Sequence, residues 1–312
     1  MGDVIIDDQG RGGVMEDGVD AEVAPLNVVG VAVITRDRRE VLMTTLQRLR
    51  ALPQRPPIAV VDNASRDGTA AAVRRRFPDI SIERSEKNLG AAARTVAAEL
   101  LGTPIVAFAD DDSWWANDAL DRLATAFAGN PDLGLVAARV LVGPEGRLDP
   151  TCELMRSSPL RDNGLPGPRI LGFVACGVAV RREAFLAAGG FEPRFGIGSE
   201  EDLLSIDLAA AGWQLCYLDA VVAHHHPSAD YPRPGRESRA LRNDLWTLWL
   251  RRPLRSALGG TARTLGRAVR DPTARRALAG AACGAPWVVR NRRKVPAALE
   301  CDLRRLERHG PD

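Results

Sequence analysis

The stretch that decides the fold is an apolar segment running into three acids, Ile105-Val106-Ala107-Phe108-Ala109-Asp110-Asp111-Asp112. A short, continuous apolar run is typical of a strand that is buried on both faces of a sheet. Three adjacent carboxylates at the end of such a strand repel one another, which destabilises the fold unless something compensates their charge. A divalent cation with oxygen ligands is one interpretation. A turn before a helix N-terminus, where acids suit the helix dipole, is an equally good one.

Upstream of this segment, apolar strands alternate with helical patterns. Strands are predicted at residues 28–34, 58–61 and 80–83, and helices at 41–49, 69–76 and 90–101. Such alternation produces right-handed crossovers and a parallel sheet with helices on both faces. We therefore predict an α/β fold.

Downstream of the aspartates the pattern is less regular. Strands are predicted at residues 135–142, 173–180 and 215–223, helices at 117–128 and 200–211, and loops over 143–172. We expect these strands to extend the sheet into a mixed, mostly parallel one that is flanked by helices.

The two ends of the chain differ in composition from its middle. Residues 1–24 are rich in Gly and Asp and are predicted to be disordered. Residues 233–312 carry 19 Arg and Lys against 7 Asp and Glu and show helical patterns. They are predicted to form a basic helical C-terminal region, which leaves residues 25–232 for the α/β domain.

Polar residues follow each of the first four strands. The segments are Thr35-Arg36-Asp37-Arg38, the run from Asp62 to Thr69, Asn88-Leu89-Gly90 and the three aspartates. Because ligands of open parallel sheets bind at the carboxyl ends of the strands, this edge is the predicted site. Taken alone, the run from Asp62 to Thr69 is better explained by turn chemistry.

Two further polar clusters lie in the second half of the chain. A carboxylate of Glu200-Glu201-Asp202 could deprotonate an acceptor hydroxyl, whereas Ser199 with Asp202 also fits a helix capping box. A histidine of His224-His225-His226 could bind a metal or a diphosphate, or this run could be a solvated loop.

In their order and spacing, these segments resemble the family 2 glycosyltransferases over about residues 27–227, with Gly189-Gly190-Phe191 and Ala211-Gly212-Trp213 as further motifs. The resemblance implies a GT-A-type nucleotide-diphospho-sugar transferase fold with a C-terminal helical appendage. It implies an inverting transfer from a UDP- or dTDP-linked sugar. The acceptor would be a hydroxyl of a cell-envelope glycan, a lipid-linked intermediate or a natural product.

The resemblance also assigns a donor site. Thr35 and Asp62 would bind the base, and Asp110 would lie near the ribose. Arg94 would approach the diphosphate, and the site would also include Asn88 and Asp111. The segment after Thr35 departs from the family pattern, because Arg36-Asp37 replaces the usual Tyr-Asn.

The same resemblance implies a metal and a base. Mn²⁺ or Mg²⁺ would be held by Asp112 with Asp110 and His225, and would neutralise the leaving diphosphate. The base would lie among Glu200, Glu201 and Asp202. Glu201 aligns with the usual base, although the family has Asp there.

Three other functions compete with this hypothesis. A sugar-phosphate nucleotidyltransferase needs a Gly-rich loop after the first strand, and residues 34–40 contain no glycine. A non-catalytic nucleotide-sugar-binding module would more often have lost one of the acids. The basic region suggests nucleic acid, but Trp246, Trp249 and Trp287 are its only Trp, Tyr or Phe residues. Trp246 and Trp249 are better explained by helix packing, so we expect no nucleic-acid partner.

Cysteines and hydropathy bear on location. The five scattered cysteines predict free thiols, and the chain has no signal-peptide pattern and no run of 18 apolar residues. We expect a cytoplasmic protein, and a peripheral position at the inner face of the membrane is one interpretation of its basic region. Its basic region would contact an anionic membrane, an acidic acceptor or a partner subunit, or would be a solvated helical cap.

Overall fold

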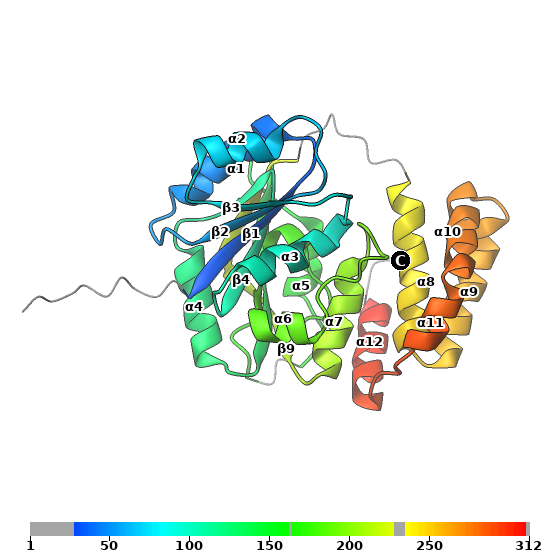
Figure 1. The fold of residues 1–312 in the computed structure, drawn as a ribbon. Coiled ribbons are helices and arrows are strands. Elements are labelled where there is room, and N and C mark those ends of the chain that lie inside the picture. Colours follow the sequence, from blue (N-terminus) through cyan, green and yellow to red (C-terminus); the bar gives the residue numbers. More distant parts are fainter. Residues whose placement is uncertain (1–27, 162–163, 228–234, 310–312) are drawn as a thin grey trace, which may run out of the picture.

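The computed structural model describes residues 28–161, 164–227 and 235–309 (Figure 1). The predicted disorder of residues 1–24 therefore lies outside the described residues. The first half of the sheet contains four parallel strands in the order β3-β2-β1-β4. They are β1 (Val29–Thr35), β2 (Ile58–Asp62), β3 (Ser81–Arg84) and β4 (Ile105–Asp110).

The second half of the sheet continues from β4 in the order β8-β6-β9-β5, with β7 on β6. β8 is antiparallel to both β4 and β6, so β6 and its parallel neighbour β9 run in the direction of β1–β4. The sheet is therefore mixed and mostly parallel, as predicted. Its remaining strands are β5 (Ser113–Trp115), β6 (Leu133–Val142), β7 (Arg147–Leu148), β8 (Val178–Arg181) and β9 (Gln214–His225).

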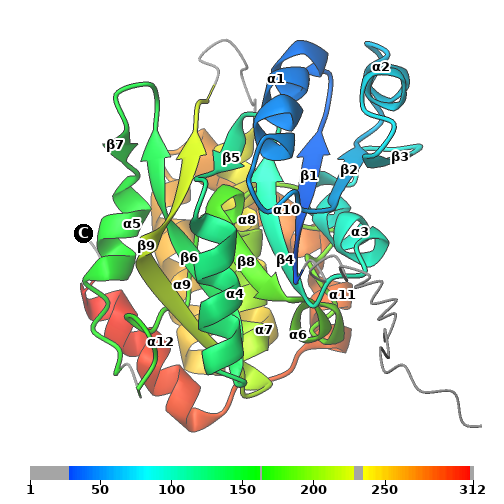
Figure 2. The same cartoon turned by 90° about the vertical axis from the view of Figure 1, so that its left-hand side faces the viewer.

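The core lies on both faces of this sheet, because alternate residues of each strand point to opposite sides. Val31 and Val33 of β1 pack on one face with Leu42 and Leu46, whereas Ile34 packs on the other. The first face is covered by α1 (Arg39–Arg50), α2 (Thr69–Arg76) and α4 (Ala119–Gly129) (Figure 2). The second is covered by α3 (Ala93–Leu100), α5 (Pro150–Arg156), α6 (Arg182–Ala187) and α7 (Glu200–Ala210).

The prediction of loops over residues 143–172 was partly wrong, because β7 pairs with β6 and the Asp149 side chain caps α5 within this range. Two further boundary differences concern the site. The strand expected at residues 173–180 begins at Val178, because only residues 178–181 pair with β4 and β6, and η2 (Ala175–Gly177) is a 3₁₀ turn. The last strand was expected to end at residue 223, but β9 continues to His225 because it pairs with Val142 of β6 and Ser113 of β5. Both differences place polar residues in the site.

The C-terminal residues form a layer of helices against α7 (Figure 1). They are α8 (Arg236–Arg251), α9 (Leu254–Ala268), α10 (Pro272–Cys283), α11 (Ala285–Asn291) and α12 (Ala297–His309). As expected, Trp246 is buried, and it packs against Phe195 with ring centroids 5.8 Å apart. Asn243 of α8 donates to the Phe195 carbonyl at 3.0 Å, which ties this layer to the loop before α7.

Candidate active site

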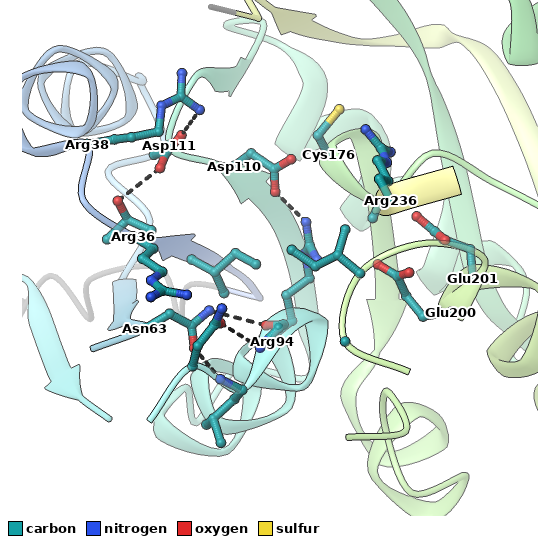
Figure 3. A pocket seen from close by; sticks show the side chains of 18 of the residues that line it. Arg36, Arg38, Asn63, Arg94, Asp110, Asp111, Cys176, Glu200, Glu201 and Arg236 are labelled. Carbon is teal, nitrogen blue, oxygen red and sulfur yellow. Dashed lines mark hydrogen bonds and ion pairs between the residues drawn. The ribbon is translucent and has the colours of Figure 1, made fainter. Parts of the chain in front are cut away.

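A pocket of about 580 Å³ lies at the carboxyl ends of β1 and β4 (Figure 3). One wall of the pocket depends on a close backbone contact that only a glycine permits. Gly90 opens η1 (Gly90–Ala92) at a φ of +62°, and a Cβ there would lie 2.6 Å from the backbone of Gly196. This close approach lets the Ala91 amide donate to the Gly196 carbonyl at 2.8 Å, which joins the start of α3 to the loop before α7.

The pocket collects most of the predicted site residues, but not all of them. Those that line it are Thr35, Asn88, Arg94, Asp110, Asp111, Glu200, Glu201 and His225. Asp62, Asp112 and Asp202 are not among its lining residues.

Two arginines compensate much of the charge of the three aspartates. Arg94 of α3 forms an ion pair with Asp110, and Figure 3 shows the two side chains pointing toward one another. Arg38 Nη1 lies 2.6 Å from Asp111 Oδ1 and 2.8 Å from Asp112 Oδ2. Arg38 follows the first strand, and no local sequence pattern pairs it with acids 73 residues away.

The three carboxylates differ in environment. Asp111 is buried and accepts a hydrogen bond from the Thr35 hydroxyl at 2.9 Å. Burial and the neighbouring carboxylates raise the pKa of Asp111 to about 7, despite the charge of Arg38. Burial also disfavours the charged form of Asp112, but His225 and Arg38 outweigh it and lower the pKa of Asp112. Asp110 is 25% exposed and faces the pocket.

Because side chains alternate along β9, one of the three histidines faces the aspartates of the pocket. His225 Nε2 lies 3.4 Å from Asp112 Oδ1. Burial lowers the pKa of His225, but Asp112 and Asp110 raise this pKa by more. His224 points to the other side of β9 and stacks on Trp114 with centroids 5.4 Å apart. His226 meets the edge of the same ring at 4.6 Å.

The carboxylates and the imidazole of this cluster suit a hard divalent cation, whereas the buried Cys176 thiol does not. Ligand atoms of Asp110, Cys176 and His225 lie within 4.8 Å of one another, and the buried Asp112 Oδ1 lies 3.4 Å from His225 Nε2. Carboxylate oxygens and imidazole nitrogen are ordinary ligands of Mn²⁺. Sequence reasoning missed Cys176, because only the turn η2 brings its thiol beside residues of β4 and β9.

The acids at the start of α7 have a different setting. The Gly198 amide donates to Glu200, so this carboxylate is held by the loop before the helix. Ser199 has a φ of +57° and makes no capping hydrogen bond through its side chain, so the capping-box alternative is wrong. Burial and the adjacent Glu200 charge raise the pKa of Glu201 to about 8. Asp202 is exposed and lies outside the pocket lining.

Asp62, which was expected to bind the base, and Asn88, which was expected in the donor site, are held by turns. The Ser65 amide donates to Asp62 Oδ1 at 2.8 Å, while Asp62 Oδ2 is buried without a hydrogen-bond partner. Asn88 accepts from the Gly90 amide at 2.9 Å. Asn63, a neighbour that the sequence did not single out, lines the pocket and accepts from the Leu89 amide at 3.1 Å.

The basic region also reaches the pocket. Arg236 and Arg239, in the first turn of α8, line the side opposite Arg36 and Arg38 (Figure 3 labels Arg236). The sequence placed them in an appendage, and only the packing of α8 against the loop before α7 brings them here. Positive side chains at this mouth suit an anionic ligand.

Comparison with known proteins agrees with this geometry. The model of a family described as glycosyl transferase family 2 matches residues 30–187. An N-acetylglucosaminyl-diphospho-decaprenol L-rhamnosyltransferase of Mycobacterium tuberculosis is 26% identical over 279 residues, which cover 75% of this chain and 90% of that protein.

Solved structures show the same fold. The mannosyltransferase PcManGT from Pyrobaculum calidifontis, in complex with GDP-Man and Mn²⁺, matches with a TM-score of 0.54 and 20% identity over 90% of this chain and 86% of that one. GalNAc-T7 with UDP, GalNAc and Mn²⁺ matches with a TM-score of 0.55 and 16% identity. That match covers 72% of this chain and only 48% of GalNAc-T7.

The fold and the family model define a GT-A glycosyltransferase. The chain belongs to glycosyl transferase family 2, as its motifs predicted. It is an inverting glycosyltransferase, which excludes the nucleotidyltransferase and the non-catalytic module as its main function.

Proposed function

We propose that this enzyme transfers a sugar from a nucleoside diphosphate to a hydroxyl of a glycan carried on a polyprenyl diphosphate. The acceptor class is supported by the mycobacterial relative, whose name specifies a diphospho-decaprenol acceptor. The solved structures of PcManGT with GDP-Man and of GalNAc-T7 with UDP support the donor class. UDP and dTDP remain the two donor nucleotides proposed.

The observation that carries the proposal is the opposition of two acidic clusters across one pocket. Asp110 and His225 line the side of β4 and β9, and Glu201 lines the side of α7. A donor diphosphate would lie against the first side and the acceptor hydroxyl against the second. Such positioning lets one bond form as the other breaks.

We assign the metal to Asp110, Asp112 and His225. Mn²⁺ is the proposed ion, since both compared structures contain it. Such an ion supplies charge to the leaving diphosphate. Arg94 supports it by fixing the orientation of Asp110, and Arg236 lies where it can meet a phosphate oxygen.

Glu201 is the proposed base. It takes the proton of the acceptor hydroxyl while that oxygen attacks the anomeric carbon, and the nucleoside diphosphate leaves with the electrons of the glycosidic bond. The inversion follows from this single displacement. A pKa near 8 makes Glu201 a stronger base than an exposed carboxylate, so the proposal predicts a rate that rises with pH toward and above 8.

We further propose that the enzyme acts on the cytoplasmic side of the membrane. All five cysteines are unpaired, which supports a reducing compartment. In the described part of the chain, no helix has both the length and the apolar character that a bilayer crossing requires.

The experiment is a transfer assay with radiolabelled UDP- and dTDP-sugars, Mn²⁺ and a polyprenyl-diphosphate-linked N-acetylglucosamine acceptor. We expect label in the lipid fraction with one donor class, and loss of that label in Glu201→Gln. Label transferred only to lipid-free glycans would overturn the proposed acceptor.

A further inference from the structure

Helix α9 carries an apolar ridge that faces away from the protein. Leu254, Leu258 and Leu265 are 55–58% exposed, and Val269, which caps the helix, is 77% exposed. Their spacing of four, seven and four residues places them on one helix face. Exposed apolar residues elsewhere in the described chain are scattered, so this row is the notable apolar surface among the described residues.

The opposite face of α9 is firmly packed, so the ridge is not a frayed segment. Ala257, Gly260 and Thr264 are buried. A Cβ at Gly260 would lie 2.4 Å from Leu248 of α8, and the Trp249 indole donates to Thr261 at 2.9 Å. These contacts fix the rotation of α9 and keep its leucines in solvent.

The solvent-exposed surface of α9 also carries a basic strip. Arg255, Arg263 and Arg267 are exposed on the helix and Arg270 just beyond its end, and residues 254–268 contain no acid. Within the described residues, the one ion pair of these arginines joins Arg267 to Asp271 at 3.4 Å, beyond the end of the helix. Apolar residues next to arginines are the pattern of a helix that lies in a membrane interface.

We propose that α9 is a docking surface for an anionic phospholipid bilayer. The leucines enter the boundary between headgroups and acyl chains, and the arginines meet lipid phosphates. Charge complementarity favours an anionic bilayer over a second copy of this chain as the binding partner. The basic strip of α9 contains no acids, so the strips of two copies would repel each other.

The placement of α9 connects this surface with the pocket. α9 packs on the C-terminal part of α8, at Leu248 and Trp249 (Figure 1). Arg236, the first residue of α8, lines the pocket. The 16 residues of α8 span ~24 Å. Docking through α9 would thus hold the pocket near the membrane. The proposal agrees with a lipid-linked acceptor, although it rests on the surface of α9 alone.

The test is vesicle flotation of the full chain without donor or acceptor. Vesicles of phosphatidylcholine alone are compared with vesicles that also contain phosphatidylglycerol. We expect flotation with the anionic vesicles, and a loss as salt rises because salt screens the arginines.

Two pairs of variants separate the ridge from the charge. Leu258→Glu with Leu265→Glu should weaken binding by at least about tenfold, whereas Leu154→Glu on α5, which is 49% exposed, should not. Arg255→Glu with Arg263→Glu should weaken it by at least about fivefold per residue, whereas Arg74→Glu with Arg75→Glu on α2 should have little effect. Unchanged melting temperatures show that all variants fold.

The outcomes decide the proposal independently of the transferase activity. Equal flotation of the ridge variant and its control would overturn it, as would equal binding to neutral vesicles or no binding at all. A wild-type dimer that the ridge variant converts to a monomer would assign the ridge to a second copy instead. A chain that binds vesicles but transfers no sugar would contradict only the proposed function.

Discussion

The two acidic clusters of the pocket have nearly the same composition and opposite environments. The aspartates after β4 each have a positive partner in Arg94, Arg38 or His225. Within the described residues, Glu200, Glu201 and Asp202 form no ion pair, and Glu200 is held by a backbone amide instead. Three acids in a row therefore do not define one role.

The two environments separate metal binding from proton transfer within one pocket. Positive partners keep Asp112 ionised near neutral pH, and an ionised carboxylate can hold a cation. Without such a partner, burial and a like charge leave Glu201 with a pKa of about 8, so it exchanges protons near working pH. The predictions below test this division.

The largest effect is expected from Glu201→Gln. The amide keeps the shape of the side chain but cannot take the acceptor proton, so the kcat of transfer should fall by roughly 10³-fold. Binding of the nucleotide should stay unchanged. As a matched control, Asp202→Asn on the same helix should keep most of the activity, because Asp202 is exposed outside the pocket lining. Steady-state kinetics compare the two; if Asp202→Asn is the inactive one, the base is misassigned.

A somewhat smaller effect is expected from Asp112→Asn. The substitution removes a negative charge from the proposed Mn²⁺ site, so the ion that would stabilise the leaving diphosphate would be held less tightly. The kcat/KM of transfer should therefore fall by roughly 10²-fold. The matched control is Asp118→Asn, a surface acid that pairs with Arg122 at 2.7 Å. Full activity of Asp112→Asn over a range of Mn²⁺ concentrations would remove Asp112 from the metal site.

Arg38→Gln should have a moderate effect that depends on pH. Arg38 favours the charged forms of Asp111 and Asp112, so its loss raises both pKa values. Mn²⁺ affinity should drop about tenfold at neutral pH, and recover as the pH rises above the new pKa values. Calorimetric titration with Mn²⁺ at several pH values measures this. A pH-independent drop would mean that Arg38 acts through packing alone.

The smallest effect on chemistry is expected from Gly90→Ala, which tests the scaffold that both clusters share. A Cβ there meets the Gly196 backbone, and the φ of +62° strains any other residue. The free energy of unfolding should fall by about 1–3 kcal/mol. Gly68→Ala shares a positive φ but meets nothing within 4 Å, so it should lose less. Urea denaturation of the two variants gives the comparison.

Much of the fold was predictable because local patterns determine it. The apolar runs and the helices between them predicted the parallel half of the sheet, and the ordered motifs predicted the family; both are confirmed. The position of His225 agrees with its expected place, while its role and the other site roles stay predictions. Domain boundaries also stay predictions, since residues 228–234 lie outside the described part.

The remaining features depend on contacts between distant segments. Arg38 meets acids more than 70 residues away, and Cys176 joins the cluster through a turn that was expected to be a strand. Arg236 reaches the pocket only because α8 packs beside the loop before α7. Ser199 matched a capping pattern, but its backbone conformation turns the hydroxyl away from that role.

The most direct test of the separation between metal binding at Asp112 and proton transfer at Glu201 is a measurement of melting temperature. Wild type, Asp112→Asn and Glu201→Gln are each measured with UDP or dTDP, with and without Mn²⁺. A ligand that binds the folded state raises the melting temperature. The account predicts a Mn²⁺-dependent increase in wild type and Glu201→Gln that is lost in Asp112→Asn. An increase that survives in Asp112→Asn, or disappears in Glu201→Gln, would contradict it.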